Sequence, residues 1–189
     1  MGQYYHTVSL DAKNYLTAHD HDGGYDFNGI KLMEHSYIGN SLTAAVENLI
    51  KKGGAWYEHR IVWAGDYADP EPDTITEEKP NGENLYDLIK NKLIVPVEDQ
   101  KRNGRLRYLV NLDKNEFVDL YKVQADDYDL KIHPLPLLTC EGNGRGGGDF
   151  RTENEDYLNL IGSWARNRVT IQTKKPKGMT ELEFNLIEV

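Results

Sequence analysis

The chain of 189 residues has one cysteine, three methionines and no long apolar run. A single cysteine cannot form a disulfide within the chain, so nothing indicates an oxidising compartment. A transmembrane helix needs about 18 to 20 consecutive apolar residues, and no segment approaches that length. The polar start, Met1 to His6, matches neither a signal peptide nor the N-myristoylation pattern. These absences predict a cytoplasmic protein without a membrane segment.

Positive charge is also scarce in the first half of the chain. Residues 1–100 carry 8 basic and 17 acidic side chains, whereas residues 101–189 carry 14 of each, which gives a net charge of −9. A general nucleic-acid binder needs a positive surplus to displace counterions from phosphates. The charge therefore argues against nucleic acid as the partner. It leaves an unidentified protein or small-molecule ligand, and no residue pattern identifies a cofactor.

Period-two alternation of apolar and polar residues predicts that strand outweighs helix. The residues 113–115 are polar turn formers between two β-rich runs, so a hairpin is expected there. The strands that we expect cover residues 59–65, 105–112, 116–123, 132–140, 167–172 and 181–186. We therefore expect an α+β fold that is mostly antiparallel β, with two or three short helices.

The helical signal is confined to a few segments. Residues 41–52 place Leu42, Ala45, Val46, Leu49 and Ile50 on one apolar stripe, and glycines follow at 53 and 54. A shorter helix is expected over 84–90. A third is expected to begin at residue 152, where Thr and Glu have capping-box spacing.

The segment 69–83 contains three prolines and six acidic residues, which is typical of a solvated loop. We expect one domain over residues 1–189, with this loop and a short helix between the halves 1–69 and 101–189. Val8 to Asp11 matches Val110 to Asp113, and Gly54 to Arg60 matches Gly162 to Arg168, in the same order in each half. Two related β-rich halves and chance matches among common strand residues are both open explanations.

A glycine run at residues 141–149 contains the spacing G-x-G-x-x-G at Gly142, Gly144 and Gly147. Backbone N–H groups of such a loop, helped by Arg145, could surround an anion or a nucleotide phosphate. A Rossmann site is not indicated, because no βαβ unit follows. A P-loop is not indicated either, because Gly148 and Asp149 replace the Lys-Ser/Thr pair. A tight structural turn is the alternative to anion binding.

Two clusters could hold a metal ion. His19, His21 and Asp22 combine imidazole and carboxylate ligands within four residues. Asp66 and Asp69 follow a strand that is expected to be buried, and together with Asp149 and one histidine (19, 21 or 133) they would suit a metal-dependent hydrolase or transferase. The alternative for both clusters is an ordinary exposed polar loop. We expect Cys140 and the three tryptophans to pack in the core.

Several motifs resemble an uncharacterised family of small bacterial and bacteriophage proteins. They are the residues 2–5 (GQYY), 63–69 (WAGDYAD), 141–149 (EGNGRGGGD) and 162–165 (GSWA). The resemblance spans nearly the whole chain, but it implies no established activity, cofactor or catalytic residue. It implies only a context, namely a cytoplasmic accessory protein related to phage.

These motifs are loop-like, and function usually resides in loops, so we expect them to meet in one cleft. The candidate lining residues are Asp66, Asp69, Glu141, Asn143, Arg145, Asp149 and Trp164. The first prediction for the function is that of a binding or interaction protein, with an accessory or counter-defence role in phage infection. The metal-dependent enzyme and the anion- or nucleotide-binding glycine loop are the alternatives. The sequence leaves open whether the chain is an enzyme.

Overall fold

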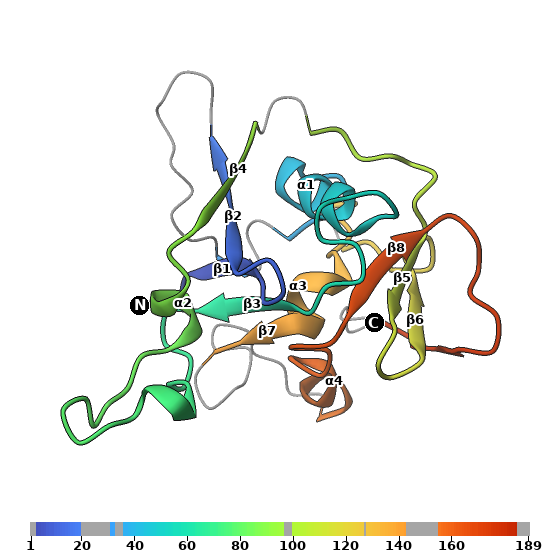
Figure 1. The fold of residues 1–189 in the computed structure, drawn as a ribbon. Helices are drawn as coiled ribbons and strands as arrows, with labels where there is room; N and C mark the ends of the chain where they lie inside the picture. Colours follow the sequence, from blue (N-terminus) through green and yellow to red (C-terminus); the bar gives the residue numbers. More distant parts are fainter. Residues whose placement is uncertain are drawn as a thin grey trace.

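The computed structural model describes residues 3–19, 31–32, 36–96, 100–126, 128–142 and 155–184. Helices and two β-sheets confirm the α+β class (Figure 1). The first sheet has the order β4-β2-β1-β3-β7, formed by β4 (Lys92–Pro96), β2 (Asn14–His19), β1 (Tyr5–Ser9), β3 (Ile61–Gly65) and β7 (Cys140–Glu141). The second has the order β8-β5-β6-β9, formed by β8 (Val169–Gln172), β5 (Tyr108–Asn111), β6 (Glu116–Asp119) and β9 (Thr180–Glu181).

Both sheets are mixed, so the expectation of mostly antiparallel β holds only in part. The pairs β1–β2, β1–β3, β5–β6 and β5–β8 are antiparallel. The pairs β2–β4, β3–β7 and β6–β9 are parallel. A parallel pair needs a long connection between its strands, and such non-local pairing leaves no signal in local alternation.

Helix α1 (Ser41–Ile50) confirms the expected amphipathic helix and ends two residues earlier than predicted. The Oδ1 of Asn40 caps it by accepting a hydrogen bond from the backbone N–H of Leu42 at 2.8 Å. The remaining helices are short: α2 (Leu85–Leu88), α3 (Pro134–Thr139), α4 (Glu155–Leu160) and the 3₁₀ turn η1 (Pro72–Thr74). Helix α2 lies within the predicted 84–90, and α4 lies just after the start predicted at 152.

The strand predicted over residues 132–140 is wrong, because most of that segment is helix α3. Pro134 occupies the first turn, where a missing N–H costs nothing. The Nδ1 of His133 accepts a hydrogen bond from the N–H of Leu135 at 3.1 Å and caps the helix. A short apolar run fits a buried strand and a buried helix equally well, so periodicity could not separate them.

One hydrophobic cluster includes side chains from both sheets and from α1 and α3. As expected, Cys140 and the three tryptophans (Trp56, Trp63 and Trp164) are fully buried in it. Burial raises the pKa of the Cys140 thiol to about 12, so this sulfur stays protonated and is no nucleophile. Among the described residues, no helix is long and apolar enough to cross a lipid bilayer.

The two halves of the chain repeat one arrangement of three strands. In the first half, β1 pairs with both β2 and β3 in antiparallel fashion, and in the second half β5 pairs with both β6 and β8 in the same way. The helix of each half packs on the opposite half, since α1 contacts β8 and α3 contacts β3. The strands β1, β2 and β3 thus correspond to β5, β6 and β8.

Side-chain hydrogen bonds recur at corresponding positions. Asp11 accepts from the backbone N–H and Nε of Arg60 at 2.7 and 2.9 Å, and Asp113 accepts from those of Arg168 at 2.7 and 2.8 Å. Residues 60 and 168 also form an antiparallel bridge with each other, as expected for equivalent residues beside a pseudo-two-fold axis. The two halves thus share these contacts, and a common origin of the halves stays a hypothesis.

The buried tryptophans extend this correspondence. The indole Nε1 of Trp56 donates to Asn14 Oδ1 at 3.0 Å, and that of Trp164 donates to Glu116 Oε2 at 2.8 Å. In each half the acceptor is the first residue of the second strand. The core of each half is therefore tied to its hairpin by one indole hydrogen bond.

Candidate functional site

The predicted motifs partly converge at the end of the first sheet. Strands β3 and β7 are parallel, with Ala64 opposite Glu141. The segments that follow these two strands therefore leave the sheet at the same edge. A Cβ atom at Gly65 would lie 2.8 Å from the carbonyl oxygen of Glu141. Only glycine permits this approach. The segment 63–69 therefore lies beside the start of the glycine run.

Arg166 joins this edge to the acidic loop. Its Nε and Nη2 donate to the two carboxylate oxygens of Glu141 at 2.7 and 2.8 Å, and its Nη1 donates to Glu71 at 2.9 Å. Nη2 also contacts the second carboxylate oxygen of Glu71. The hydrogen bonds that Arg166 donates to Glu141, and then those to Glu71, raise the pKa of Arg166 far above its usual value. All three nitrogens of the guanidinium donate to these two carboxylates, and we call this contact the clamp. Arg166 therefore has no free pair of N–H groups with which to bind an anion.

Two exposed tyrosines flank Asp66 at the same edge. Asp66 Oδ1 accepts from the backbone N–H of Tyr4 at 3.1 Å, and the Asp66 carbonyl accepts from Asn84 Nδ2 at 2.9 Å. The side chains of Tyr4 and Tyr67 are 44% and 48% exposed, and Asp69 is exposed as well. We call Tyr4, Asp66, Tyr67 and Asp69 the acidic end of the protein.

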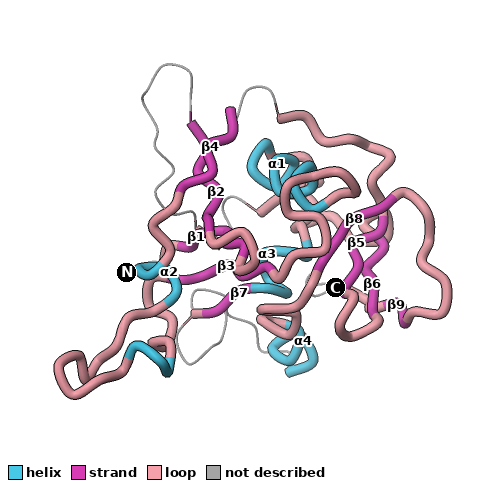
Figure 2. Tube along the Cα trace, in the orientation of Figure 1, coloured by secondary structure: helices cyan, strands magenta, loops and turns pink. Residues whose placement is uncertain are grey.

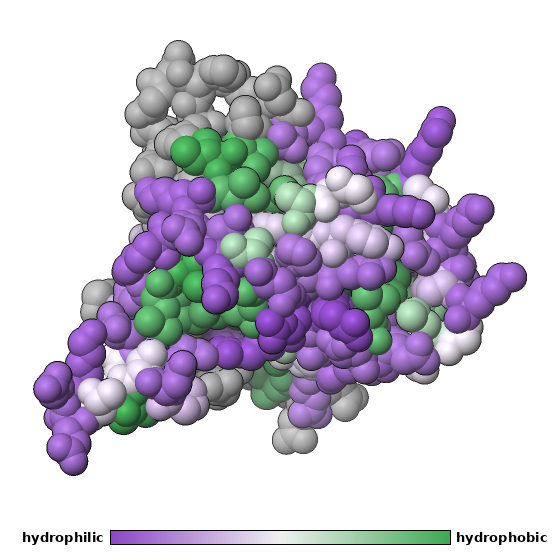
Figure 3. Space-filling view, in the orientation of Figure 1, coloured by the Kyte–Doolittle hydropathy of each residue, from purple (hydrophilic) through white to green (hydrophobic). Residues whose placement is uncertain are grey.

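The residues 69–84 form an arm that projects from the body next to the acidic end (Figures 1 and 2). Its base is closed, because Glu71 N–H donates to the Glu83 carbonyl at 2.9 Å and Thr74 Oγ1 accepts from Glu83 N–H at 2.8 Å. The space-filling view shows a hydrophilic surface over most of the arm (Figure 3). Its exposed carboxylates belong to Asp69, Asp73, Glu77 and Glu78.

The other predicted site residues do not join this group within the described part of the chain. Trp164 is fully buried and lies in the core rather than on an open surface. Asn143, Arg145, Asp149, His21 and Asp22 lie outside the described residues, and His19 ends strand β2.

The histidine proposed as a fourth metal ligand is engaged elsewhere. His133 is buried, and its Nε2 lies 3.2 Å from Glu47 Oε1, which also accepts from Arg102 at 3.0 Å. Among the residues that the structure describes, no three His, Cys, Asp or Glu side chains are grouped to hold a metal ion. Because Asp149, His21 and Asp22 are outside these residues, the metal site stays a prediction.

A serine–histidine contact has a structural explanation. Ser9 Oγ lies 2.9 Å from His59 Nδ1, at hydrogen-bond distance. At the corresponding place in the second half, Asn111 Nδ2 donates to Asn167 Oδ1 at 2.9 Å. Because two amides replace the hydroxyl and the imidazole without changing the contact, it serves to join strands.

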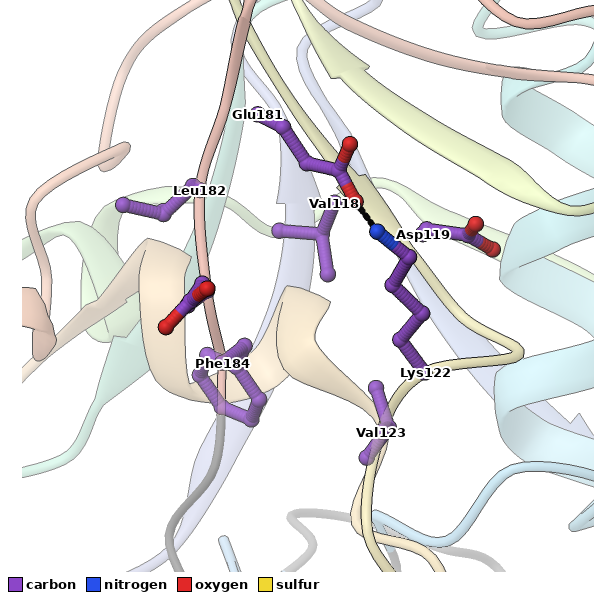
Figure 4. Close-up of a pocket in the computed structure, with 8 residues that line it drawn as sticks. Val118, Asp119, Lys122, Val123, Glu181, Leu182 and Phe184 are labelled. Atoms are coloured by element: carbon purple, nitrogen blue, oxygen red, sulfur yellow. Dashed lines mark hydrogen bonds and ion pairs between the residues drawn. The ribbon is translucent and has the colours of Figure 1, made fainter.

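A cavity of about 280 Å³ lies beside β6, and Figure 4 shows residues that line it. Val118, Val123 and Phe184 supply apolar surface, and Lys122 forms an ion pair with Glu181. The nearby Asp119 accepts two hydrogen bonds from Arg107, at 2.7 and 2.6 Å. These ion pairs already neutralise Lys122 and Asp119, which leaves the exposed Glu183 as a further charged group of the lining.

A larger groove of about 430 Å³ lies where the end of α1 meets β8. Sequence reasoning missed it, because the contact joins residues far apart: Thr170 Oγ1 donates to the Ile50 carbonyl at 2.9 Å. In the sequence, only the paired lysines at 51 and 52 pointed to this groove. Comparison of the chain with models of protein families, with curated proteins and with solved structures finds no match.

Proposed function

We propose that this protein is a cytoplasmic binding protein whose acidic end recognises a positively charged segment of a partner protein. The observation that carries the proposal is the pair of half-exposed rings on two neighbours of Asp66, namely Tyr4, whose backbone N–H donates to Asp66, and Tyr67, the next residue in the chain. Tyrosine is enriched at protein interfaces, where it buries a large ring at low entropic cost and keeps a polar tip.

The negative charges around the tyrosine rings favour a partner with a positive charge. Carboxylates attract lysine and arginine, and the tyrosine faces add cation–π attraction to the same groups. The arm supplies further exposed carboxylates at Asp69, Asp73, Glu77 and Glu78. Their combined field would steer a basic segment toward the acidic end. The resemblance to bacterial and phage proteins places this role, as a proposal, in a bacterial or infected cell, where an accessory or counter-defence protein would act.

The test is retention of a partner from a bacterial lysate by the immobilised protein and its variants. Removing a central interface ring usually costs more than 1 kcal/mol, so Tyr67→Ala should weaken retention by about tenfold. Tyr128→Ala is the matched control, because Tyr128 is 84% exposed and lies in another part of the chain. Equal retention by the two variants would refute the proposal.

Two double variants of equal net charge test whether the position of the carboxylates matters. Asp69→Asn with Asp73→Asn should weaken retention and reduce its dependence on salt. Asp129→Asn with Glu183→Gln removes the same number of exposed carboxylates outside the acidic end and the arm, and should leave retention unchanged. The proposal fails if both pairs lower retention equally.

A further inference from the structure

The groove between α1 and β8 combines an apolar floor with a basic rim. Leu106 and Ile171 form the floor and are almost fully buried. Lys51, Lys52 and Lys174 lie around it. We call these five residues and Tyr57 the lysine groove.

The fold fixes both walls of the lysine groove. Lys51 leaves α1 and forms a parallel bridge with Ile171, so the end of the helix lies against β8. Strand β8 is an edge strand of the second sheet, and Lys174 is the second residue after its end. The lysines on the two walls therefore come from segments about 120 positions apart and face one space.

The lysines are not required to cap α1. The carbonyl of Glu47 accepts from Lys51 N–H at 3.0 Å, that of Leu49 from Trp56 N–H at 2.9 Å, and that of Ile50 from Thr170 Oγ1 at 2.9 Å. Backbone and hydroxyl donors thus satisfy the last turn. The Lys51 ammonium instead donates to Asn48 Oδ1 at 2.8 Å, so the lysines contribute side-chain contacts and charge beside the groove and do not cap the helix.

The charge of the lysine groove opposes that of the whole chain. Of the described residues that line it, none is acidic, although the protein has a net charge of −9. Three ammonium groups around an apolar floor suit an occupant with carboxylates on both sides of one apolar group. Nucleic acid suits it less, because the chain repels phosphates overall and only Tyr57 offers a ring for stacking.

We propose that the lysine groove binds an acidic protein segment that inserts one apolar side chain over Leu106 and Ile171. This goes beyond the proposed function, because the partner has the opposite charge and the site lies at the second sheet rather than at the first. The exposed apolar surface beside this floor belongs to Tyr57 and the lysine stems, on which the apolar side chain packs, and the three lysines select and orient the segment.

The test uses the full chain and a fluorescein-labelled peptide, Glu-Glu-Ile-Glu-Glu, with fluorescence anisotropy as the readout. Lys52→Met with Lys174→Met should lower the affinity at least tenfold. Lys114→Met with Lys177→Met removes the same charge from exposed lysines outside the groove, and should have little effect. Replacing isoleucine by serine in the peptide should also lower the affinity severalfold, because serine buries less apolar surface against Tyr57 and the lysine stems.

Several outcomes would overturn the proposal. Equal loss from the two lysine pairs would mean that only the net charge matters. Equal binding of the serine peptide, or full competition by inorganic phosphate, would show simple anion binding. Displacement of the peptide by an oligonucleotide at lower concentration than by unlabelled peptide would indicate a nucleic-acid site. Self-association that Lys52→Met with Lys174→Met abolishes would show that the groove takes the acidic arm of a second copy. None of these outcomes depends on the tests of the acidic end.

Discussion

The acidic end and the lysine groove occupy corresponding places in the two halves of the fold. Cys140 pairs in parallel with Trp63 of β3, just as Lys51 pairs with Ile171 of β8. The next residue along is Glu141 in one case and Lys52 in the other. Three residues beyond Trp63 lies Asp66, and three beyond Ile171 lies Lys174. The same backbone arrangement thus holds acidic residues at one place, of which Asp66 is partly exposed and Glu141 buried, and lysines at the other.

This difference separates the contacts that both halves share from the charged side chains in which they differ. Both halves share the strand order, the hydrogen bonds that an arginine donates to an aspartate, and the indole hydrogen bonds. The charged groups at the strand ends do not recur. The two halves thus share the contacts that build the sheets, and our two binding proposals rest on charged residues that differ between them.

The largest expected effect concerns Arg166, which corresponds to Glu58. Both residues have positive φ angles, 66° and 59°, but only Arg166 joins two carboxylates. Arg166→Met leaves Glu71 and Glu141 without their cation and should lower the free energy of unfolding by about 3 kcal/mol. Glu58→Met alters an exposed side chain and should change it by less than about 0.5 kcal/mol. Urea unfolding measures both, and similar values for the two variants would contradict the clamp.

A pH-dependent effect of at most the same size separates His6 from its counterpart, Tyr108. His6 stacks between Tyr15 and Tyr86, with ring centroids 4.2 and 3.8 Å away. Burial, together with the charge of Lys92, lowers the pKa of His6 to about 4. Unfolded histidine has a pKa near 6.5, so the unfolded state binds the proton more tightly between these values. The free energy of unfolding should therefore fall by up to about 3 kcal/mol from pH 6.5 to pH 4.

The measurement compares His6→Phe and Tyr108→Phe with the parent protein by urea unfolding at several pH values. His6→Phe keeps an aromatic ring in the stack and should remove this part of the pH dependence. Tyr108→Phe should keep it, because tyrosine does not titrate in that range. The same slope in all three proteins would show that His6 is not responsible.

The smallest effect tests the similarity of the halves. The side chains of Asp11 and Asp113 are each 33% exposed, and their arginines are 51% and 53% exposed. Hydrogen bonds from Arg60 and Arg168 lower the pKa of their respective aspartates. Asp11→Ala and Asp113→Ala should each cost about 1 kcal/mol, since exposed ion pairs contribute little. Thermal unfolding should give equal shifts, and a cost confined to one half would weaken the correspondence.

Local patterns predicted the elements that are stabilised locally. The stripe of α1, the strand 61–65 and the hairpin around residues 113–115 all follow from spacing over a few residues. Segment 132–140 was misread, because the prolines at 134 and 136 suit a first helical turn as well as a strand edge. The three parallel pairings were missed, because each depends on a connection that returns from a distance.

The sequence revealed the acidic end better than the lysine groove. Asp66 and Glu141 stand out in motifs that a parallel strand pair then brings together. Arg166 was missed, although it lies two residues beyond the buried Trp164 and forms the clamp. The lysine groove depends on α1 meeting β8, a contact that only the folded chain reveals.

The most direct test of the account gives the groove the charges of its counterpart. Lys52→Glu with Lys174→Asp installs the residue types found at Glu141 and Asp66, on exposed positions that tolerate charge. Anisotropy titrations would compare the acidic peptide with an arginine-rich peptide of equal length. The account predicts that the variant loses the acidic peptide, binds the arginine-rich one more tightly than the parent does, and unfolds at nearly the same temperature. Unchanged binding of the acidic peptide by a folded variant would contradict it.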